Sequence, residues 1–182
     1  MPPASAYPNG WFLVARSADL GDRAVLPLRY FGKDLVLWRA EDGRPAMFDA
    51  HCPHLGAHLG YGGAVEADGL RCPFHKWRYG LDGGCTFVQQ EGEFFDLDKA
   101  DYGLAPVQVD VWEGFIFVNL AREPEQSLTE FLGPMVTALE GYPFDRMTER
   151  FAYRTEVRAN WKLFMDAFAE FYHAPVLHAK QS

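Results

Sequence analysis

Up to residue 120, short stretches rich in apolar, β-branched and aromatic residues are separated by polar turn residues, a pattern typical of β-strands. Turn dipeptides such as Asn9-Gly10 and Asp42-Gly43 separate the first of these stretches. The predicted strands are residues 11–15, 24–31, 34–39 and 46–48. A further stretch over residues 107–120 alternates around Glu113-Gly114 and predicts a closing hairpin. Short strands separated by frequent turns predict an antiparallel all-β domain.

The pattern then changes towards a helical period. Ser127 and Glu130 have the spacing of a capping box, so a helix is expected to begin there, and Gly133-Pro134 interrupts it. Residues 149–158 alternate again and predict a strand that begins a second sheet. From Asn160 onward, apolar residues recur every three or four positions and predict an amphipathic helix. They are Trp161, Phe164, Met165, Phe168 and Tyr172.

Composition restricts the class of protein. A chain of 182 residues can bury one core or two small packed domains, and 48% hydrophobic with 23% charged residues is ordinary globular composition. No apolar run approaches the ~18 residues of a membrane span, and the N-terminus has no signal-peptide pattern, so we expect a soluble, cytoplasmic protein. A net charge of −8 argues against non-specific nucleic-acid binding, which depends on Lys and Arg.

Residues of the metal-binding types gather in a Cys-x-His pair, Cys52 and His54, and in a Cys-x-x-His pair, Cys72 and His75. Two thiolates and two imidazoles are the ligands of a Rieske [2Fe-2S] cluster, in which the cysteines hold one iron and the histidines the other. A structural zinc site takes the same ligand types, but its usual spacing keeps the cysteines in one pair and the histidines in the other. The mixed pairs therefore favour the cluster, with zinc and chance clustering as the alternatives.

Other residues near these pairs receive structural interpretations. Cys85 is the remaining cysteine, so no disulfide framework is expected, and it is predicted to be a buried small hydrophobe. His51 and His58 flank the first pair and are interpreted as loop residues. Trp77 and Tyr79 follow the second pair, and we expect them to pack beneath the cluster rather than contact a ligand.

A second candidate metal site lies near the C-terminus. Asp166, Glu170 and His173 fall at i, i+4 and i+7 of the predicted helix, which places them on one face. Pro175 then bends the chain, so that His178 can return towards His173. Two histidines beside an acid are candidates for a mononuclear Fe(II) site with open positions for O₂. From the residues alone, helix-capping or core roles for these histidines are the stronger alternative.

Three stretches, residues 52–85, 105–120 and 160–173, resemble the Rieske non-haem iron oxygenases, most of all the ketosteroid 9α-hydroxylase and cholesterol 7-desaturase branch. The resemblance implies an all-β Rieske domain with antiparallel sheets, followed by the start of an α+β catalytic domain. The expected boundaries are 1–120 for the Rieske domain, 121–146 for a linker with short helices, and 147–182 for the N-terminal part of the catalytic domain. Lys76 departs from the family, which usually has glycine or another small or polar residue there.

The resemblance also implies an activity and its residues. Cluster electrons and O₂ would be used at a mononuclear Fe(II) to hydroxylate an apolar substrate, with a steroid preferred and aromatic or alkyl monooxygenation, dioxygenation and desaturation left open. His173 and His178 match iron ligands. Glu170 matches an acid that bridges an iron-ligand histidine to a cluster-ligand histidine of the neighbouring subunit. Asp166 matches a frequently amidic position near the iron, and its role is left open.

The same resemblance implies partners: an NADH- or NADPH-dependent flavin reductase, with or without an intermediate ferredoxin, and neighbouring copies in a homotrimer. A Rieske ferredoxin without catalysis is the alternative, because it would explain everything through Leu120, although not the segment from Asn160 to His178. A zinc-stabilised interaction module is a third hypothesis. Relatives supply a carboxylate iron ligand from far downstream of the second histidine, so we expect this chain to be part of a longer protein.

Overall fold

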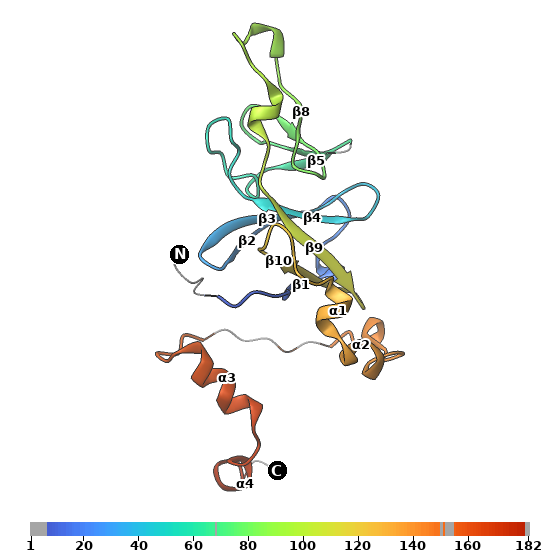
Figure 1. Ribbon diagram of the computed structural model, residues 1–182, viewed down its shortest axis with the longest axis vertical. Helices are drawn as coiled ribbons and strands as arrows, with labels where there is room; N and C mark the ends of the chain where they lie inside the picture. The colour runs from blue at the N-terminus through green and yellow to red at the C-terminus, as the bar shows by residue number, and fades with distance from the viewer. Residues whose placement is uncertain (1–6, 68, 150, 152–154, 181–182) are drawn as a thin grey trace. The chain divides into compact units, whose positions relative to one another are not determined.

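The computed structural model describes residues 7–67, 69–149, 151 and 155–180. The chain divides into two compact units, Met1–Arg146 and Met147–Ser182. The first unit contains two antiparallel sheets, one of six and one of four strands (Figure 1). The predicted antiparallel β fold is therefore confirmed for this unit.

The larger sheet has the strand order β1-β10-β9-β4-β3-β2. Its strands are β1 (Phe12–Arg16), β2 (Val25–Tyr30), β3 (Lys33–Arg39), β4 (Pro45–Asp49), β9 (Pro106–Trp112) and β10 (Phe115–Asn119). All the strands predicted up to residue 120 are present, with small shifts at their ends. The closing hairpin turns at Glu113 and Gly114, whose φ angles of 49° and 78° suit a two-residue turn.

The smaller sheet has the order β5-β6-β7-β8. Its strands are β5 (Ala64–Glu66), β6 (Gly69–Arg71), β7 (Arg78–Tyr79) and β8 (Cys85–Phe87). Strands of two or three residues carry too little alternation to be predicted individually. They nevertheless position the candidate site, because the first Cys/His pair lies between β4 and β5 and the second lies between β6 and β7.

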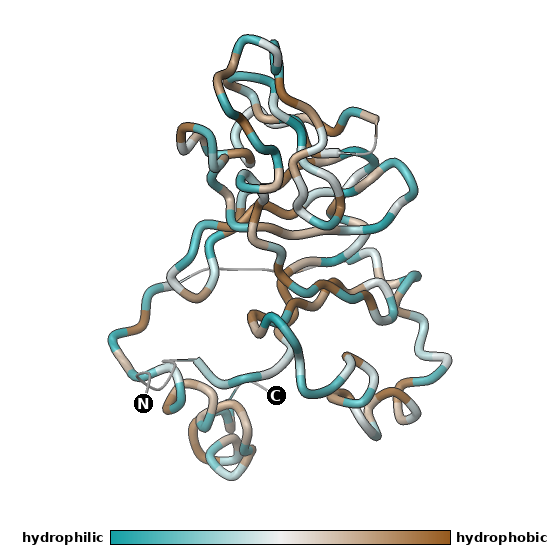
Figure 2. The backbone as a smooth tube through the Cα atoms, turned by 45° about the horizontal axis from the view of Figure 1, so that its top comes forward, coloured by the Kyte–Doolittle hydropathy of each residue, from teal (hydrophilic) through white to brown (hydrophobic). Residues whose placement is uncertain are grey.

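Strand β3 is buried on both faces, because it lies between two apolar cores. Val36 and Trp38 pack with residues of the smaller sheet such as Tyr79, whereas Leu35 and Leu37 pack towards the other face. All these β3 side chains are fully buried. Alternate side chains of a strand point to opposite faces, so a run of apolar residues serves both cores. Figure 2 shows the resulting mixture of hydrophobic and hydrophilic stretches along the backbone.

Gly83 belongs to the smaller sheet's last turn and contacts the segment before β9. We expect that this position does not tolerate a side chain. Its φ is +83°, and an added Cβ would lie 2.4 Å from the carbonyl oxygen of Leu104. Gly83→Ala should therefore lower the free energy of unfolding by about 2 kcal/mol or more in urea denaturation. Gly114→Ala is the matched control, because Gly114 has φ +78° with nothing within 4 Å of an added Cβ. Equal losses in the two variants would contradict the role of the close contact.

Short helices follow and interrupt the strands. The helix α1 (Leu128–Leu132) begins with the predicted capping box, in which Ser127 and Glu130 each bond the other's backbone N–H. Gly133 separates it from α2 (Pro134–Ala138), as predicted. The 3₁₀ helices are η1 (Ser17–Asp19), η2 (Glu91–Glu93), η3 (Lys99–Tyr102) and η4 (Phe144–Arg146).

The second unit contains α3 (Trp161–Ala169) and α4 (Ala174–Leu177). The predicted helix is confirmed as far as Ala169. The strand predicted over residues 149–158 falls partly outside the described residues, at 150 and 152–154, and its described members form no strand. Backbone groups of a strand need a neighbouring strand for their hydrogen bonds, and the described part of this unit offers none.

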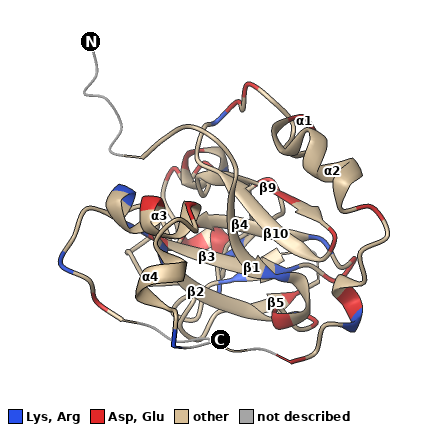
Figure 3. Cartoon of the chain, turned by 90° about the horizontal axis from the view of Figure 1, so that it is seen from below, with Lys and Arg blue, Asp and Glu red and all other residues tan. Residues whose placement is uncertain are grey.

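None of the described helices is long and apolar enough to cross a membrane. Figure 3 shows Lys and Arg positions interspersed with Asp and Glu positions along the ribbon.

Candidate metal centres

The two Cys/His pairs lie on loops of matching backbone geometry. The N–H of Cys52 donates to the carbonyl of Ala57 at 2.9 Å, and the N–H of Cys72 donates to the carbonyl of Trp77 at 2.7 Å. Each cysteine therefore closes a turn with the residue five positions later. Gly56 and Lys76 occupy the same place in the two turns, with φ angles of +74° and +61°.

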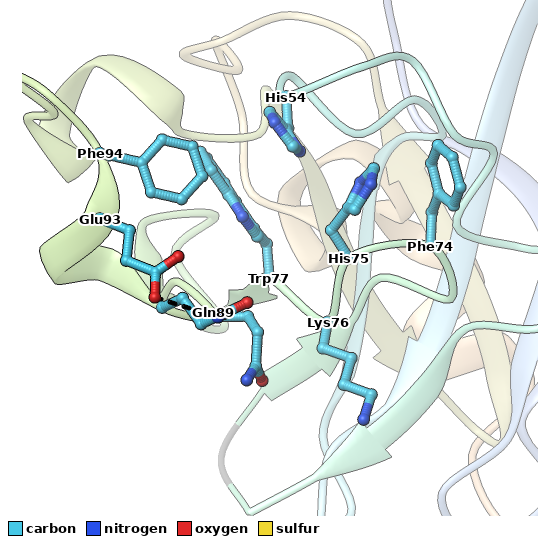
Figure 4. Close-up of a pocket in the computed structure, with 9 residues that line it drawn as sticks. His54, Phe74, His75, Lys76, Trp77, Gln89, Glu93 and Phe94 are labelled. Carbon is cyan, nitrogen blue, oxygen red and sulfur yellow. Dashed lines mark hydrogen bonds between the residues drawn. The ribbon is translucent and has the colours of Figure 1, made fainter.

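The loops place the thiols inside and the imidazoles outside. Cys52 and Cys72 are 3% and 1% exposed, whereas His54 and His75 are half-buried. The two imidazole centroids are 4.8 Å apart. Figure 4 shows these rings between Phe74 on one side and the Trp77 and Phe94 rings on the other. An inner pair of thiols and an outer pair of imidazoles is the division that a Rieske cluster requires.

The arrangement fits two irons better than one zinc ion. A structural zinc site needs four ligands around one ion, but each iron of a Rieske cluster takes only two protein ligands. The donors present, two thiols and two imidazoles in separate pairs, therefore fit a [2Fe-2S] cluster and disfavour zinc.

Hydrogen bonds stabilise negative charge on the buried pair of sulfurs, Cys52 and Cys72. The Cys72 thiol, the Tyr79 hydroxyl and the N–H groups of His54 and Leu55 bond to Cys52 Sγ, and together they lower the Cys52 pKa to about 5 against the effect of burial. The bond to the Cys52 thiolate raises the pKa of Cys72, because Cys72 keeps the proton that the two sulfurs share. These hydrogen bonds favour the thiolate form of Cys52, which is the form that binds metal.

Trp77 and Tyr79 correct a prediction. Both are buried as expected, at 1% and 0% exposure, but each also contacts a proposed ligand residue. The Tyr79 hydroxyl lies 3.0 Å from Cys52 Sγ, and the Trp77 indole stacks on the His54 ring at 4.4 Å between centroids. Two aromatic residues spaced i, i+2 directly after the second pair are the sequence feature that would have indicated this.

A cavity of about 490 Å³ opens over the two imidazoles. It is lined by both rings together with aromatic, amide and charged side chains (Figure 4). The lining residues are His54, Phe74, His75, Lys76, Trp77, Gln89, Gln90, Glu93 and Phe94. The imidazole edge of the site is therefore accessible, unlike the sulfur edge.

Lys76 holds a left-handed backbone conformation that costs a residue with a side chain about 1 kcal/mol. Lys76→Gly should therefore raise the midpoint of thermal cluster loss by about 2 °C, because glycine adopts this conformation without that cost. The midpoint is measured from the visible absorption of the loaded protein. The control is Gly56→Ala, at the matching place in the first turn, which should lower the midpoint. A lower midpoint in Lys76→Gly would show that the lysine side chain stabilises the loop.

His51 and His58 form an isolated β-bridge across the first ligand loop, with ring centroids 5.1 Å apart. The N–H of Gly60 donates to His58 Nδ1 at 3.1 Å. Burial, and then the nearby His51, lower the pKa of His58. Their interpretation as loop residues agrees with this geometry.

Cys85 is half-buried rather than fully buried, and it packs against the core.

The C-terminal candidate site differs from the predicted helical face. Helix α3 ends at Ala169, and Glu170 is extended with φ −126° and ψ 153°, so Glu170 and His173 do not continue the helix that carries Asp166. The reason is local. The Glu170 carboxylate accepts hydrogen bonds from the N–H groups of Tyr172 and His173, and side-chain bonds of this kind compete with helical backbone bonds.

Glu170 and the two histidines come together despite this difference. The Glu170 carboxylate pairs with His173 Nδ1, and this hydrogen bond is the main cause that lowers the Glu170 pKa. Helix α4, with Pro175 in its first turn, returns the chain so that the His173 and His178 rings lie 5.5 Å apart. Asp166 is exposed on α3 and has no hydrogen bond or ion pair within the described residues.

Two protein families match the chain. The Rieske [2Fe-2S] domain matches residues 10–108, and the catalytic domain of the ring hydroxylating alpha subunit matches residues 144–182. The first match contains both Cys/His pairs, and the second contains Glu170, His173 and His178. The predicted cofactors, a [2Fe-2S] cluster and a mononuclear iron, are confirmed at the level of these families.

Individual relatives agree with both matches. The chain is 34% identical over 165 residues to cholesterol 7-desaturase nvd of Bombyx mori, covering 88% of this chain and 34% of the relative. It is 32% identical over 171 residues to a glycine betaine monooxygenase oxygenase subunit of Pseudomonas aeruginosa, covering 92% and 39%. A solved quaternary ammonium Rieske monooxygenase gives a TM-score of 0.77 at 26% identity, covering 96% of this chain and 49% of that one. The chain thus spans about half the length, or less, of these relatives.

Proposed function

The chain belongs to the Rieske non-haem iron oxygenases, and we propose that it provides the cluster domain and two iron ligands of a terminal oxygenase. In this proposal Cys52, His54, Cys72 and His75 hold the [2Fe-2S] cluster. The observation that carries it is the pair of matching loops, with buried thiols inside and half-buried imidazoles outside. A bound cluster of this type passes one electron at a time and has no open coordination position of its own.

We propose that His173 and His178 bind the mononuclear iron and that Glu170 orients His173. Metal-binding histidines commonly donate their second ring N–H to a carboxylate, which fixes the ring and leaves the other nitrogen for the metal. The contact between Glu170 and His173 Nδ1 supports this role, because it leaves His173 Nε2 for iron. The same carboxylate would bridge to a cluster-ligand histidine of a neighbouring copy, which calls for a homotrimer. Among the described residues, Asp166 has no hydrogen bond or ion pair that would support a catalytic role.

The proposed substrate is an apolar molecule, with a sterol preferred. Support comes from cholesterol 7-desaturase nvd, which is 43% identical in Drosophila melanogaster over 89 residues that cover 48% of this chain. A quaternary ammonium substrate is the second candidate, because relatives named for carnitine and glycine betaine match over more than 90% of the chain. Electrons would come from an NADH- or NADPH-dependent flavin reductase, directly or through a ferredoxin.

The test is a measurement on the protein loaded with iron and sulfide. The oxidised protein should be red-brown, and the reduced protein should give the EPR signal of a cluster with mixed ligands. With a flavin reductase and NADH, oxygen consumption should rise on adding a sterol, or on adding carnitine or glycine betaine if the second candidate is correct. Cluster reduction without any substrate-dependent oxygen consumption in the full-length protein would instead favour the ferredoxin alternative.

A further inference from the structure

Trp77 stands out among the rings around the candidate cluster. Its indole lies 4.4 Å from the His54 ring at an interplanar angle of 3°, a flat stack. The other rings near His54 meet it edge-on, with angles of 69° for His75 and 74° for Phe94. Parallel stacking is an arrangement that aromatic pairs favour, and of these three rings the Trp77 indole is the one that lies flat against the imidazole.

Within the described residues of this chain, the His54 imidazole has no hydrogen bond to orient it. Metal-bound histidines generally donate their second ring N–H to a carboxylate or a backbone carbonyl, and this bond fixes the ring plane. Within the described part of the chain, the His54 ring makes no hydrogen bond. His173, in contrast, has Glu170. At His54, the stacked indole is the contact that can fix the plane of the ring.

The indole itself is held firmly. Trp77 is 1% exposed, and Phe94 and Tyr102 meet its ring edge-on at 5.9 and 5.2 Å. Its carbonyl accepts the N–H of Cys72, which fixes the residue within the second ligand loop. A rigid ring of one ligand loop thus lies flat against a ligand of the other. Donation of electron density to a metal makes an imidazole more positive, and a positive ring is attracted to the face of an indole.

We propose that Trp77 is a positioning residue that orients His54 as a ligand of the outer iron by stacking on its ring. This inference rests on the proposed function, because it requires the cluster to bind at Cys52, His54, Cys72 and His75. It also explains why the two loops are not interchangeable. The first loop supplies the stacked histidine, and the second loop supplies the ring that holds it.

The test compares three variants of the cluster-loaded full chain. Trp77→Leu removes the stack, Trp77→Phe keeps a ring that can stack, and Tyr102→Leu removes a ring that contacts Trp77 but not His54. The readouts are the g-values of the reduced cluster by EPR, its midpoint potential, and iron per chain. We expect broadened, displaced g-values and a shifted potential in Trp77→Leu and near wild-type values in Trp77→Phe. Tyr102→Leu should give a much smaller change than Trp77→Leu, because Phe94 still contacts the indole and the stack on His54 remains.

Unchanged g-values and potential in Trp77→Leu would overturn the proposal. If Trp77→Leu does not fold, the measurements on Trp77→Phe test the proposal. If Trp77→Phe binds a full cluster and has g-values and a potential near those of the wild type, the result supports orientation of His54 by a stacked ring. If Trp77→Phe binds a full cluster but has broadened g-values, the result contradicts the proposal. A change of equal size in Tyr102→Leu would also contradict it, because that result would assign the effect to general packing. Absence of any cluster in the wild-type protein would overturn the proposed function itself, which is a separate outcome.

Discussion

Cys52→Ser and Cys72→Ser should each abolish the visible absorption of the cluster, whereas Cys85→Ser should leave it unchanged. Cys52 and Cys72 are the buried pair whose sulfurs share one proton, and a serine hydroxyl does not ionise near neutral pH to replace a thiolate. Cys85 lies at the edge of the core, and burial raises the pKa of its thiol, which disfavours the metal-binding form. The measurement is absorption, acid-labile sulfide and iron per chain for the three purified variants.

The three cysteine variants control for one another, because each removes one thiol from the same domain. Circular dichroism shows whether the domain remains folded when the cluster is lost. Stoichiometric zinc without sulfide in the wild-type protein would reject the cluster and restore the zinc alternative. Loss of colour in Cys85→Ser, with the fold intact, would show that the assignment of the ligands is incomplete.

The large sheet could be predicted from the sequence because its strands are five to seven residues long, rich in apolar and β-branched residues, and bounded by turn signals. The four cluster-site residues could be predicted from residue types and spacing, without knowledge of the fold. The strands of the smaller sheet could not, since β7 is only Arg78–Tyr79 and its pairing depends on neighbours distant in sequence. Contacts across the two ligand loops, such as those of Trp77 and Tyr79, depend on that pairing.

The C-terminal unit shows a different limit of sequence reasoning. A helical period predicted that Asp166, Glu170 and His173 share one face, but a period describes side-chain positions only while the backbone remains helical. At Glu170 the carboxylate bonds the next backbone N–H groups and the helix ends. Glu170 and His173 therefore meet through a turn instead of through a helical face. The proximity was predicted, but for the wrong geometric reason.

Glu170→Gln should lower the affinity for the mononuclear iron and the turnover of the full-length oxygenase, each by about 10–100-fold, and leave the cluster unchanged. The Glu170 carboxylate accepts from two backbone N–H groups and from His173 Nδ1. A glutamine has one accepting oxygen, so either its amide faces the backbone donors or it donates to His173 Nδ1. In the second case the His173 proton moves to Nε2, the nitrogen that iron needs.

Excess Fe(II) separates the two roles proposed for Glu170. If Glu170 only orients His173, saturating iron should restore the turnover of Glu170→Gln. If it also bridges to a cluster-ligand histidine of a neighbouring copy, turnover should stay low at full iron occupancy, because the electron route is interrupted. Asp166→Asn is the matched control, since it makes the same chemical change at an acid with no described contact, and it should retain both iron and turnover. Wild-type turnover in Glu170→Gln without added iron would reject both roles.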